Sequence, residues 1–352
     1  MTTAQPFLGS VDVVLATGAV ATIRPIEPED RDALRALYAR CDPDSLRLRF
    51  FSYSPRAADT DVNRMIRPGS AGHIAVVATA RGEAIGMGCV ERIKRSDDGD
   101  IALLVDDARH GEGVGMLLIE HLVDAARRAG YRKIRADVLA ENTRMLRVFR
   151  DLGAEIRSHL DYGVVDIEVP LTDRAEWRQA IDRRESIADH ASIARVLAPH
   201  SVVVIGVSTR PTSIGHRILN SIIDSGYTGD VYAVNRRGGS VGGTPAWTSI
   251  DQLPVVPDLA IVATPAAQVP TVIDDCARAG VRGAVIISDG FAELGPLGAA
   301  TQQSILAAAR SAGMRLIGPN CLGIANTDPD VSLNATFADL VPRLGTVGVA
   351  SQ

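Results

Sequence analysis

From residue 201 onward, short apolar segments alternate with helix-forming segments, and this alternation restricts the possible folds more than any other feature. The apolar segments are SVVVIGV, DVYAVN, DLAIVAT, GAVIIS and RLIG, with helical patterns at 213–225, 266–279 and 297–312. Strands that are apolar throughout need cover on both faces, which is typical of a parallel sheet with helices on each side. The pattern predicts a doubly wound α/β domain whose ligand lies at the carboxyl ends of its strands.

The first half of the chain has the pattern of a mixed-sheet α/β domain. Strand candidates at 73–80, 83–93 and 100–105 are separated only by short Gly- and Asp-rich joints, so we expect antiparallel neighbours. A strand at 19–26 and a helix at 27–40 precede them. The elements expected after them are a helix at 113–129, a strand at 133–139, a helix at 142–152 and a closing strand pair around 155–169.

The length of 352 residues favours two domains. Between the two patterns, residues 171–198 are charged, helix-prone and poor in large apolar side chains, which indicates a solvated connecting helix. The final LGTVGVASQ looks like the first strand of a further βα unit. We therefore expect domains over 1–170 and 199–330, a linker over 171–198, and the start of a truncated further α/β domain over 331–352.

Composition excludes several classes of protein. A net charge of -5 gives no reason to expect nucleic acid or an anionic membrane as a partner. No apolar run approaches the roughly 18 residues that span a bilayer, and the N-terminus lacks the layout of a signal peptide. The 4 cysteines are scattered, without zinc spacing, which predicts reduced thiols, no metal site and a cytoplasmic location.

Three alternating glycines, Gly111, Gly113 and Gly115, lie at the start of the amphipathic helix expected at 113–129, directly before its apolar residues from Met116 on. Glycine weakens a helix, so it serves another purpose here: it lets the backbone approach a ligand and point N–H groups at it. With the positive end of the helix dipole added, the loop suits phosphate or pyrophosphate. It is not a P-loop, because Met116 and Leu117 replace Lys and Ser or Thr. It follows an antiparallel meander, so it is not a dinucleotide loop either.

The segment RHGEGVGMLLIEHLVDAARRAGYRKIRADVLAENTRMLRVFRDLGAE, residues 109–155, resembles the acetyl-CoA-binding core of the GNAT N-acetyltransferases. The resemblance covers roughly 11–170, and the entry segment TIRPIEPEDRDALRALYARCDPDSLRLRFFS is similar to the Pat-type enzymes that acetylate protein lysines. His110 stands where the family usually has Gln or Arg. The resemblance implies acetyl-CoA as cofactor, held by Leu103, Val105, His110, Gly111, Glu112, Gly113, Val114, Gly115 and Asn142.

Amine acetylation needs a group that takes a proton from the ammonium, and a carboxylate can do so. In Pat-type enzymes a Glu at the start of the central strand is the usual base, and Asp100, one methylene shorter, holds that position here. The position of Asp100 is equally compatible with a structural role, as the aspartate that ends the hairpin turn before this strand. Glu91 is the alternative base, although a residue within that strand is expected to face solvent. Phe149 replaces a Tyr that many GNATs use as general acid, so solvent is expected to protonate the thiolate.

The strand and turn at 202–215 lack GxGxxG, and Asn235 stands where an NAD site needs an acid, while Arg236 and Arg237 leave NADP open. IGVS, AVNRRGG, AIVATPAAQVP, VIISDGFAE and GPNCLGI together resemble the Rossmann-like CoA-binding domain of NDP-forming acyl-CoA synthetases. That resemblance implies phosphate contacts from Gly206, Val207, Ser208 and either Arg236 or Arg237, and a pantetheine lining from Thr264 and Pro265. Neither the phosphorylated His of these ligases nor an ATP-grasp domain is present, so ligation of acids to CoA is not expected.

Three functions remain open from the sequence. The first is a protein-lysine acetyltransferase, with an acyl-CoA synthetase as a possible protein substrate and the second domain sensing CoA or docking the substrate. The second is a fragment of an NDP-forming acyl-CoA synthetase whose GNAT domain acts on a small amine. The third is a non-catalytic CoA sensor. An oligomer is compatible with all three.

Overall fold

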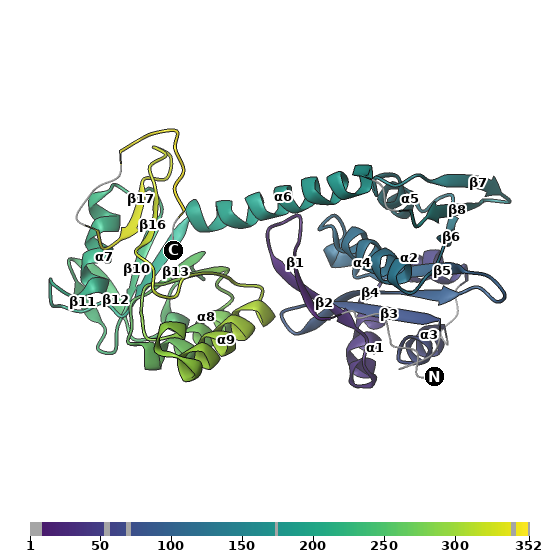
Figure 1. Cartoon of the computed structure of the whole chain (residues 1–352). Helices are drawn as coiled ribbons and strands as arrows, with labels where there is room; N and C mark the ends of the chain where they lie inside the picture. The colour runs from purple at the N-terminus through teal and green to yellow at the C-terminus, as the bar shows by residue number, and fades with distance from the viewer. Residues whose placement is uncertain (1–8, 53–56, 68–71, 173–174, 339–342, 351–352) are drawn as a thin grey trace. The chain divides into compact units, whose positions relative to one another are not determined.

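The computed structural model describes residues 9–52, 57–67, 72–172, 175–338 and 343–350 (Figure 1). The chain forms two compact units. The first comprises 1–17 and 21–188, and the second comprises 18–20 and 189–352. Each unit is built around a large sheet of its own.

The first unit contains an eight-stranded sheet in the order β1-β2-β3-β4-β5-β6-β8-β7. From β2 to β7, neighbouring strands are antiparallel except β5 and β6, which are parallel. The strands are β1 (Val11–Val14), β2 (Val20–Pro25), β3 (His73–Ala80), β4 (Glu83–Arg92), β5 (Asp98–Val105), β6 (Lys133–Leu139), β7 (Arg157–Asp161) and β8 (Val164–Pro170). The predicted meander is confirmed, and the sheet is mixed as expected.

Helices cover both faces of this sheet, with α4 on one side of β4 and α1 on the other (Figure 1). The helices are η1 (Pro28–Asp30), α1 (Arg31–Arg40), α2 (Pro43–Phe50), α3 (Ala57–Met65), η2 (Asp107–Arg109), α4 (Val114–Arg128), α5 (Thr143–Arg150) and α6 (Ala175–Leu197). The sequence did not indicate α2, α3 or β1. No residue of α2 is fully buried, so this helix lacks the apolar stripe that predicts a helix from sequence.

Two glycines inside β4 allow α4 to lie close to the sheet. A Cβ on Gly86 would stand 3.0 Å from Val114 Cγ1, and one on Gly88 would stand 2.8 Å from Leu122 Cδ1. Glycine in a strand interior is otherwise unfavourable, and close approach of another element is a common reason for it. The N-terminus of α4 is thereby held firmly over the carboxyl end of β5.

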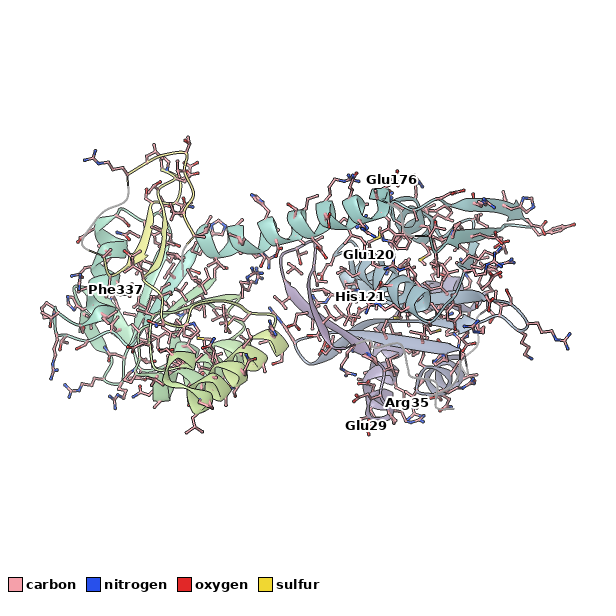
Figure 2. The ribbon with its side chains drawn as sticks, viewed as in Figure 1. Glu29, Arg35, Glu120, His121, Glu176 and Phe337 are labelled. Atoms are coloured by element: carbon pink, nitrogen blue, oxygen red, sulfur yellow. The ribbon has the colours of Figure 1, made fainter. Side chains whose placement is uncertain are left out.

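The first half of α6 is fastened to the first unit through a buried charge. Arg184 Nε donates to Glu120 Oε1 at 2.9 Å, and its Nη1 donates to the Asp151 carbonyl at 2.9 Å. Figure 2 labels Glu120, a residue of α4. Glu120 is only 9% exposed, and burial raises the pKa of its carboxyl while Arg184 opposes that shift. This part of the predicted connecting helix is therefore packed against protein rather than fully solvated.

β5 and β6 are paired over only part of their length. The register joins Asp98, Gly99 and Asp100 to the first residues of β6, and no pairing follows, although β5 continues to Val105 and β6 to Leu139. The two strands thus separate beyond Asp100 toward their carboxyl ends. Backbone groups along an unpaired strand edge are free to bind another chain or a ligand, so this opening is a candidate site.

The second unit contains a seven-stranded sheet in the order β11-β12-β10-β9-β13-β14-β15. All neighbours are parallel except the edge hairpin of β11 and β12. The strands are β9 (Ser201–Ile205), β10 (Asp230–Val234), β11 (Gly239–Val241), β12 (Thr244–Trp247), β13 (Leu259–Val262), β14 (Gly283–Ile286) and β15 (Arg315–Ile317). The sheet grows in both directions from β9, so its topological switch point lies between β9 and β13.

Helices lie on both faces of this sheet, as predicted. They are α7 (Ile214–Asp224), η3 (Ile250–Gln252), η4 (Ala266–Gln268), α8 (Val269–Ala279), η5 (Ala292–Leu294) and α9 (Pro296–Ser311). Val202 and Val204 of β9 join one apolar cluster, while Val203 and Ile205 join a second cluster on the opposite face. This alternation explains why β9 is apolar at every position.

The C-terminal part differs from the expectation. β16 (Gly323–Asn326) and β17 (Leu333–Thr336) form an antiparallel pair of their own, and Leu333 and Ala335 pack in the same apolar cluster as Val202. Residues 343–350 form neither a strand nor a helix, so the strand expected at the end of the chain is wrong for them. A strand needs a hydrogen-bonding neighbour, and no strand of the described residues pairs with this segment.

No helix among the described residues combines the length and apolar character needed to cross a membrane. Within the same residues, no group of three His, Cys, Asp or Glu side chains could hold a metal ion.

Candidate functional site

The glycine loop lies at the carboxyl end of β5, where the sequence places it. After the short helix η2, Gly111 and Gly113 adopt left-handed φ values of 84° and 87°, and Gly113 is the N-cap of α4. The first N–H groups of a helix have no partner within it. Those of Val114 and Gly115 therefore point out of the N-terminus of α4, together with the positive end of its dipole.

Open space surrounds these glycines. A Cβ on Gly111 would meet nothing within 4 Å, one on Gly113 would stand 3.8 Å from Ala16, and one on Gly115 would stand 3.7 Å from Val105 Cγ2. Protein packing therefore does not require glycine at these three positions. The bare backbone leaves room for a phosphate group against the N–H groups, and this fits the predicted site.

One backbone hydrogen bond and two side-chain contacts fix the shape of the loop. The Ala16 N–H donates to the Glu112 carbonyl at 2.9 Å, and Arg109 lies 3.3 Å from the Glu112 carboxylate. Arg144 Nη1 lies 2.8 Å from Nδ1 of His110. The His110 imidazole thus ties the loop to α5 by accepting from Arg144. A Gln side-chain carbonyl could accept the same hydrogen bond, whereas an Arg has no acceptor. Val114 is 2% exposed, so only its backbone is available to a ligand.

A cavity of about 700 Å³ lies at the carboxyl ends of β5 and β6. Its walls come from the turn after β5, the start of α5 and part of α2, namely Asp42, Pro43, Asp44, Ser45, Leu48, Asp107, Glu141, Asn142, Thr143 and Arg144. Asn142 caps α5, since its Oδ1 accepts the Met145 N–H at 3.1 Å. Of the predicted strand residues, Val105 lies next to Gly115 and Leu103 lies against Gly88, so both are on the α4 side of the sheet.

Asp100 lies where β5 and β6 begin to separate. It is the last residue of β5 paired with β6, and the residue paired with it on the other neighbouring strand, β4, is Glu91. Its carboxylate reaches solvent, yet protein encloses enough of it that desolvation raises its pKa, and the nearby Asp137 carboxylate raises that pKa further. A raised pKa makes Asp100 a stronger proton acceptor near neutral pH than an ordinary aspartate.

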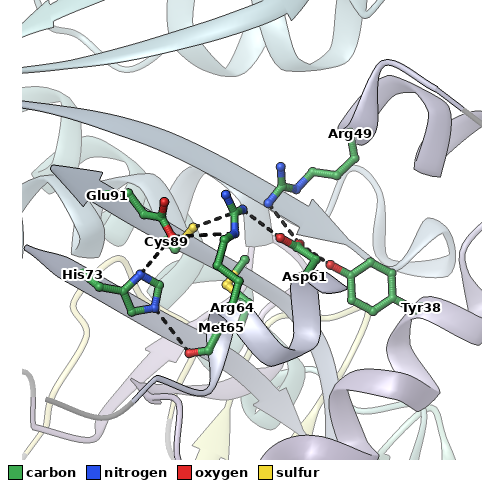
Figure 3. Close-up of polar contacts among 8 residues, drawn as sticks. All are labelled: Tyr38, Arg49, Asp61, Arg64, Met65, His73, Cys89 and Glu91. Atoms are coloured by element: carbon green, nitrogen blue, oxygen red, sulfur yellow. Dashed lines mark hydrogen bonds and ion pairs between the residues drawn. The ribbon is translucent and has the colours of Figure 1, made fainter. Parts of the chain in front are cut away.

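Glu91 does not simply face solvent, which corrects the expectation from its strand position. Its side chain is 32% exposed, and its Oε1 lies 3.7 Å from Arg64 Nε and 3.3 Å from His73 Nδ1 (Figure 3). Cross-strand partners have Cβ atoms about 5 Å apart. Two carboxylates, one restrained and one open, therefore stand side by side at the point where β5 and β6 diverge.

Phe149 is 1% exposed and belongs to the core, as expected. Two tyrosines that could replace a general acid are engaged elsewhere: Tyr38 donates to Asp61, and Tyr131 donates to the Gly72 carbonyl at 2.8 Å. Burial and the Asp61 carboxylate also raise the pKa of Tyr38.

The turn after β9 in the second unit is packed tightly. Gly206 has φ 95°, and a Cβ there would stand 2.6 Å from the Ala263 carbonyl oxygen, while one on Gly215 would stand 2.7 Å from the Gly206 carbonyl oxygen. The Gly206 N–H donates to the Val234 carbonyl at 2.9 Å. Gly206 thus allows close approach of β9, α7 and β13 but has no free donor. Val207 and Ser208 are therefore the residues of this turn that could donate hydrogen bonds to a phosphate.

Thr264 is the clearest sign of a ligand at this switch point. It is 8% exposed, and its Oγ1 has no hydrogen-bond partner among the described residues. Buried polar atoms are almost always satisfied, so an orphaned hydroxyl at the carboxyl end of β13 fits a missing ligand group. Pro265 follows directly, at the start of η4.

Asn235 stabilises a turn after β10. Its Oδ1 accepts the N–H groups of Arg237 at 2.7 Å and of Gly238 at 2.8 Å, so this side chain is not free to hold a ribose. Arg236 and Arg237 are exposed, and neither forms an ion pair within the described residues. They are available to an anionic group.

Two families of known domains match the two parts of this chain. The family described as "Acetyltransferase (GNAT) domain" matches residues 21–155, and the family described as "CoA binding domain" matches residues 200–327. The chain joins a GNAT acetyltransferase domain to a CoA-binding domain. This confirms both resemblances seen in the sequence, and it confirms acetyl-CoA and CoA as the cofactors.

The CoA-binding domain is similar to archaeal ligases. The chain is 38% identical over 158 residues to "Acetate--CoA ligase [ADP-forming] I" of Archaeoglobus fulgidus, covering 45% of this chain and 22% of that protein. It is 38% identical over 172 residues to "Acetate--CoA ligase [ADP-forming] I subunit alpha" of Pyrococcus furiosus, covering 45% and 37%. The chain thus spans 22% and 37% of the lengths of these two relatives.

The GNAT domain is similar to a solved structure, the GNAT domain of S. lividans PAT. The two are 34% identical, the match covers 46% of this chain and 96% of that one, and the TM-score is 0.43.

Proposed function

We propose that this chain is an acetyl-CoA-dependent N-acetyltransferase that acts on protein lysine, with its CoA-binding domain in a regulatory or docking role. One observation carries the proposal. An open glycine loop suited to a pyrophosphate lies at one end of the separation between β5 and β6, and two carboxylates stand at the other end. This arrangement can place an acyl donor and an amine in one opening.

The residues present fit acetyl-CoA. The N–H groups of Gly111, Gly113, Val114 and Gly115 would hold its pyrophosphate, while His110 and Glu112 keep the loop in shape. Leu103, Val105 and Asn142 would line the path toward Asp100. Bound acetyl-CoA supplies an acetyl thioester, and holding an amine beside it contributes much of the rate enhancement.

Asp100 would accept the proton that the lysine ammonium must lose before its nitrogen can attack. Asp100 must be ionised to act as a base, so turnover should fall when the pH drops through its pKa. Since that pKa is raised by desolvation and by Asp137, this loss should begin at a higher pH than for an ordinary aspartate. Phe149 has no hydroxyl that could act as a general acid, so water protonates the leaving thiolate.

In the second domain, Val207 and Ser208 would bind a phosphate of CoA where Gly206 permits close approach. Arg236 or Arg237 would hold another phosphate, and Thr264 and Pro265 would line the pantetheine. The unpartnered Thr264 hydroxyl supports this assignment. Because related sequences are named as acyl-CoA ligases, we propose an acyl-CoA synthetase as the protein substrate. One relative is named as a subunit, so we also propose that this chain associates with others.

The test is mass spectrometry of a purified acyl-CoA synthetase incubated with this chain and acetyl-CoA. We expect acetylation of a lysine, and the Asp100→Asn variant should lower the rate by about 10²–10⁴-fold while still binding acetyl-CoA. The lost rate should recover partly at high pH, where more of the lysine is already neutral. Acetylation of small amines alone would instead favour the synthetase fragment. No acetylation of any amine between about pH 6 and 9 would favour the sensor.

A further inference from the structure

β7 (Arg157–Asp161) is the outermost strand of the sheet of the first unit, at the opposite end from β1 (Figure 1). Among the described residues, β8 is the one strand that pairs with it. In an antiparallel ladder, alternate residues of a strand direct their N–H and C=O groups to opposite sides. The outer edge of β7 therefore carries backbone donors and acceptors that no described strand uses. Such an edge is a template for pairing with another chain.

The side chains of β7 are not covered either. All five residues of the strand are exposed. Leu160 is 62% exposed, and Tyr162, in the turn that follows the strand, is fully exposed although its φ of 43° is left-handed. Large apolar side chains gathered at an open edge favour a contact with another molecule.

The sequence of β7, RSHLD, is complementary to itself when two copies run antiparallel. A two-fold contact uses the same residues on both copies, so its axis passes between one residue and its own copy. With the axis at His159, Arg157 lies opposite Asp161 of the second copy, and symmetry forms this pair twice. Opposite charges at directly opposed positions stabilise a ladder, whereas like charges destabilise it.

Charge also selects this register over its two neighbours. With the axis at Ser158, Arg157 would face His159 of the second copy, and Asp161 would face Glu155, another carboxylate. With the axis at Leu160, Arg157 would face Gly163 and lose its anionic partner. Charged side chains often protect an edge by repelling further strands. Here one charge of each sign near the two ends of β7 repels a copy in one register and attracts it in another.

Both charges are accessible to a second copy. The Arg157 side chain is 72% exposed, and within the chain its Nη2 lies 3.5 Å from Oε1 of Glu155. Glu168, opposite Arg157 on β8, is engaged by Lys133 Nζ at 2.7 Å and by Arg135 Nη2 at 3.0 Å. Asp161 faces Val164 on β8 and forms no ion pair with a described residue. Its carboxylate can therefore accept a cation from outside the chain.

We propose that β7 pairs antiparallel with β7 of a second copy of this chain, about a two-fold axis at His159, and so joins the sheets of two first units into one. The same axis brings the half-buried Ile156 of each copy toward the exposed Tyr162 of the other. The strand has only five residues, so the contact is smaller than that of a permanent dimer, and the dimer dissociates on dilution. This inference does not depend on the proposed acetylation.

Exchange of the two charges is the first test. In sedimentation of the full chain, we expect the wild type to pass from monomer to dimer as its concentration rises. Arg157→Asp and Asp161→Arg should each weaken the dimer by at least about tenfold, because each change places like charges opposite one another twice. A mixture of the two variants should form a mixed dimer, since one strand then carries only acids at these positions and the other only arginines.

Asp32→Arg is the matched control for Asp161→Arg. It changes the net charge by the same amount on α1, at a side chain that is 94% exposed, and should dimerise as the wild type does. A wild type that stays monomeric at every concentration would overturn the proposal. A wild-type dimer that neither charge change weakens, or a mixture of the two variants that stays monomeric, would show that another surface is used.

Cysteine substitutions test the register. The axis places residue 159 opposite its own copy, with Cβ atoms about 5 Å apart, whereas residues 158 and 160 lie about 7–8 Å from their own copies. Only the first separation suits a disulfide. Under mild oxidation, His159→Cys should form a covalent dimer that Ser158→Cys and Leu160→Cys do not form. Three of the native cysteines are buried and Cys321 is half-buried, and the wild type gives their background.

Cross-linking through position 158 or 160 instead of 159 would contradict the proposed axis. If a charge variant does not fold, as circular dichroism would show, the three cysteine variants still decide, because they keep both charges of β7. None of these measurements uses acetyl transfer, so a chain that acetylates nothing would count against the proposed function and leave the test of the dimer intact.

Discussion

The two units each turn from a strand into a helix through glycines, but the glycines serve different purposes. In the first unit, Cβ atoms on Gly111, Gly113 and Gly115 would meet no protein atom closer than 3.7 Å. In the second, Cβ atoms on Gly206 and Gly215 would stand 2.6 and 2.7 Å from backbone oxygens. The first turn keeps space free for a ligand, and the second lets three elements of the protein touch.

This difference shows that glycine in a strand-to-helix turn does not by itself identify a phosphate site. In the second unit, the evidence for a ligand comes from the orphaned Thr264 hydroxyl and the free arginines, not from Gly206. Substitutions in the turn of the second unit should therefore act mainly on folding, and substitutions in the turn of the first unit should act mainly on ligand binding.

The largest effect is expected for Gly206→Val. The left-handed φ and the contact with the Ala263 carbonyl both oppose a side chain, so the second unit should lose on the order of 3–5 kcal/mol of stability or fail to fold. Thermal unfolding of the full chain measures this. Gly226→Ala is the control: φ there is 74° but nothing lies within 4 Å, so the cost should be about 1 kcal/mol. If the two changes cost the same amount of stability, Gly206 has no special packing role.

Gly113→Val comes next: the left-handed φ of 87° should cost about 1–2 kcal/mol of stability, less than at Gly206 because no protein atom is close, and the main effect should be on binding. Calorimetric titration of the wild-type chain with CoA should show two sites. The variant should lose at least about tenfold in affinity at one of them, because the valine side chain enters the space for the pyrophosphate. The second site should be unchanged. Unaltered binding at both sites would contradict the assignment of loop 110–115.

Gly115→Ala sharpens the same point. Gly115 lies in the first turn of α4 without a left-handed φ, and a Cβ would make only an ordinary contact with Val105, so stability should stay equal or rise by up to about 1 kcal/mol. Acetyl-CoA affinity should nevertheless fall several-fold. A variant that is as stable as the wild type and binds as well would show that the cofactor does not approach this residue.

The smallest effect is expected for the double change Arg236→Ala and Arg237→Ala. Both side chains are exposed, so their attraction for a CoA phosphate is screened. Affinity at the second site should fall by less than about tenfold at low salt, and the difference should shrink as salt is added. NADH should not bind at this site in any variant, because Asn235 is engaged in its turn. A thermal shift with NADH but not with CoA would contradict the CoA assignment.

Much of the fold followed from local patterns in the sequence. The apolar runs at 201–205 and 259–262 predicted a parallel sheet because every residue of a doubly covered strand is buried. The meander 73–105 followed from short turns between apolar strands. The segments α2, β11 and β12 were missed, since none of them buries a regular apolar stripe.

By itself, the sequence determined the two domain types, the order of their main elements and the position of the glycine loop, because periodicity and glycine spacing are local properties of the chain. Only the tertiary structure decided which glycines face space and which face protein. It also decided that Glu91 of β4 lies against Arg64 of α3 and His73 of β3, three residues from three different elements. Such contacts depend on strand register and on how α3 packs against the sheet, and neither is encoded in the neighbourhood of any one residue.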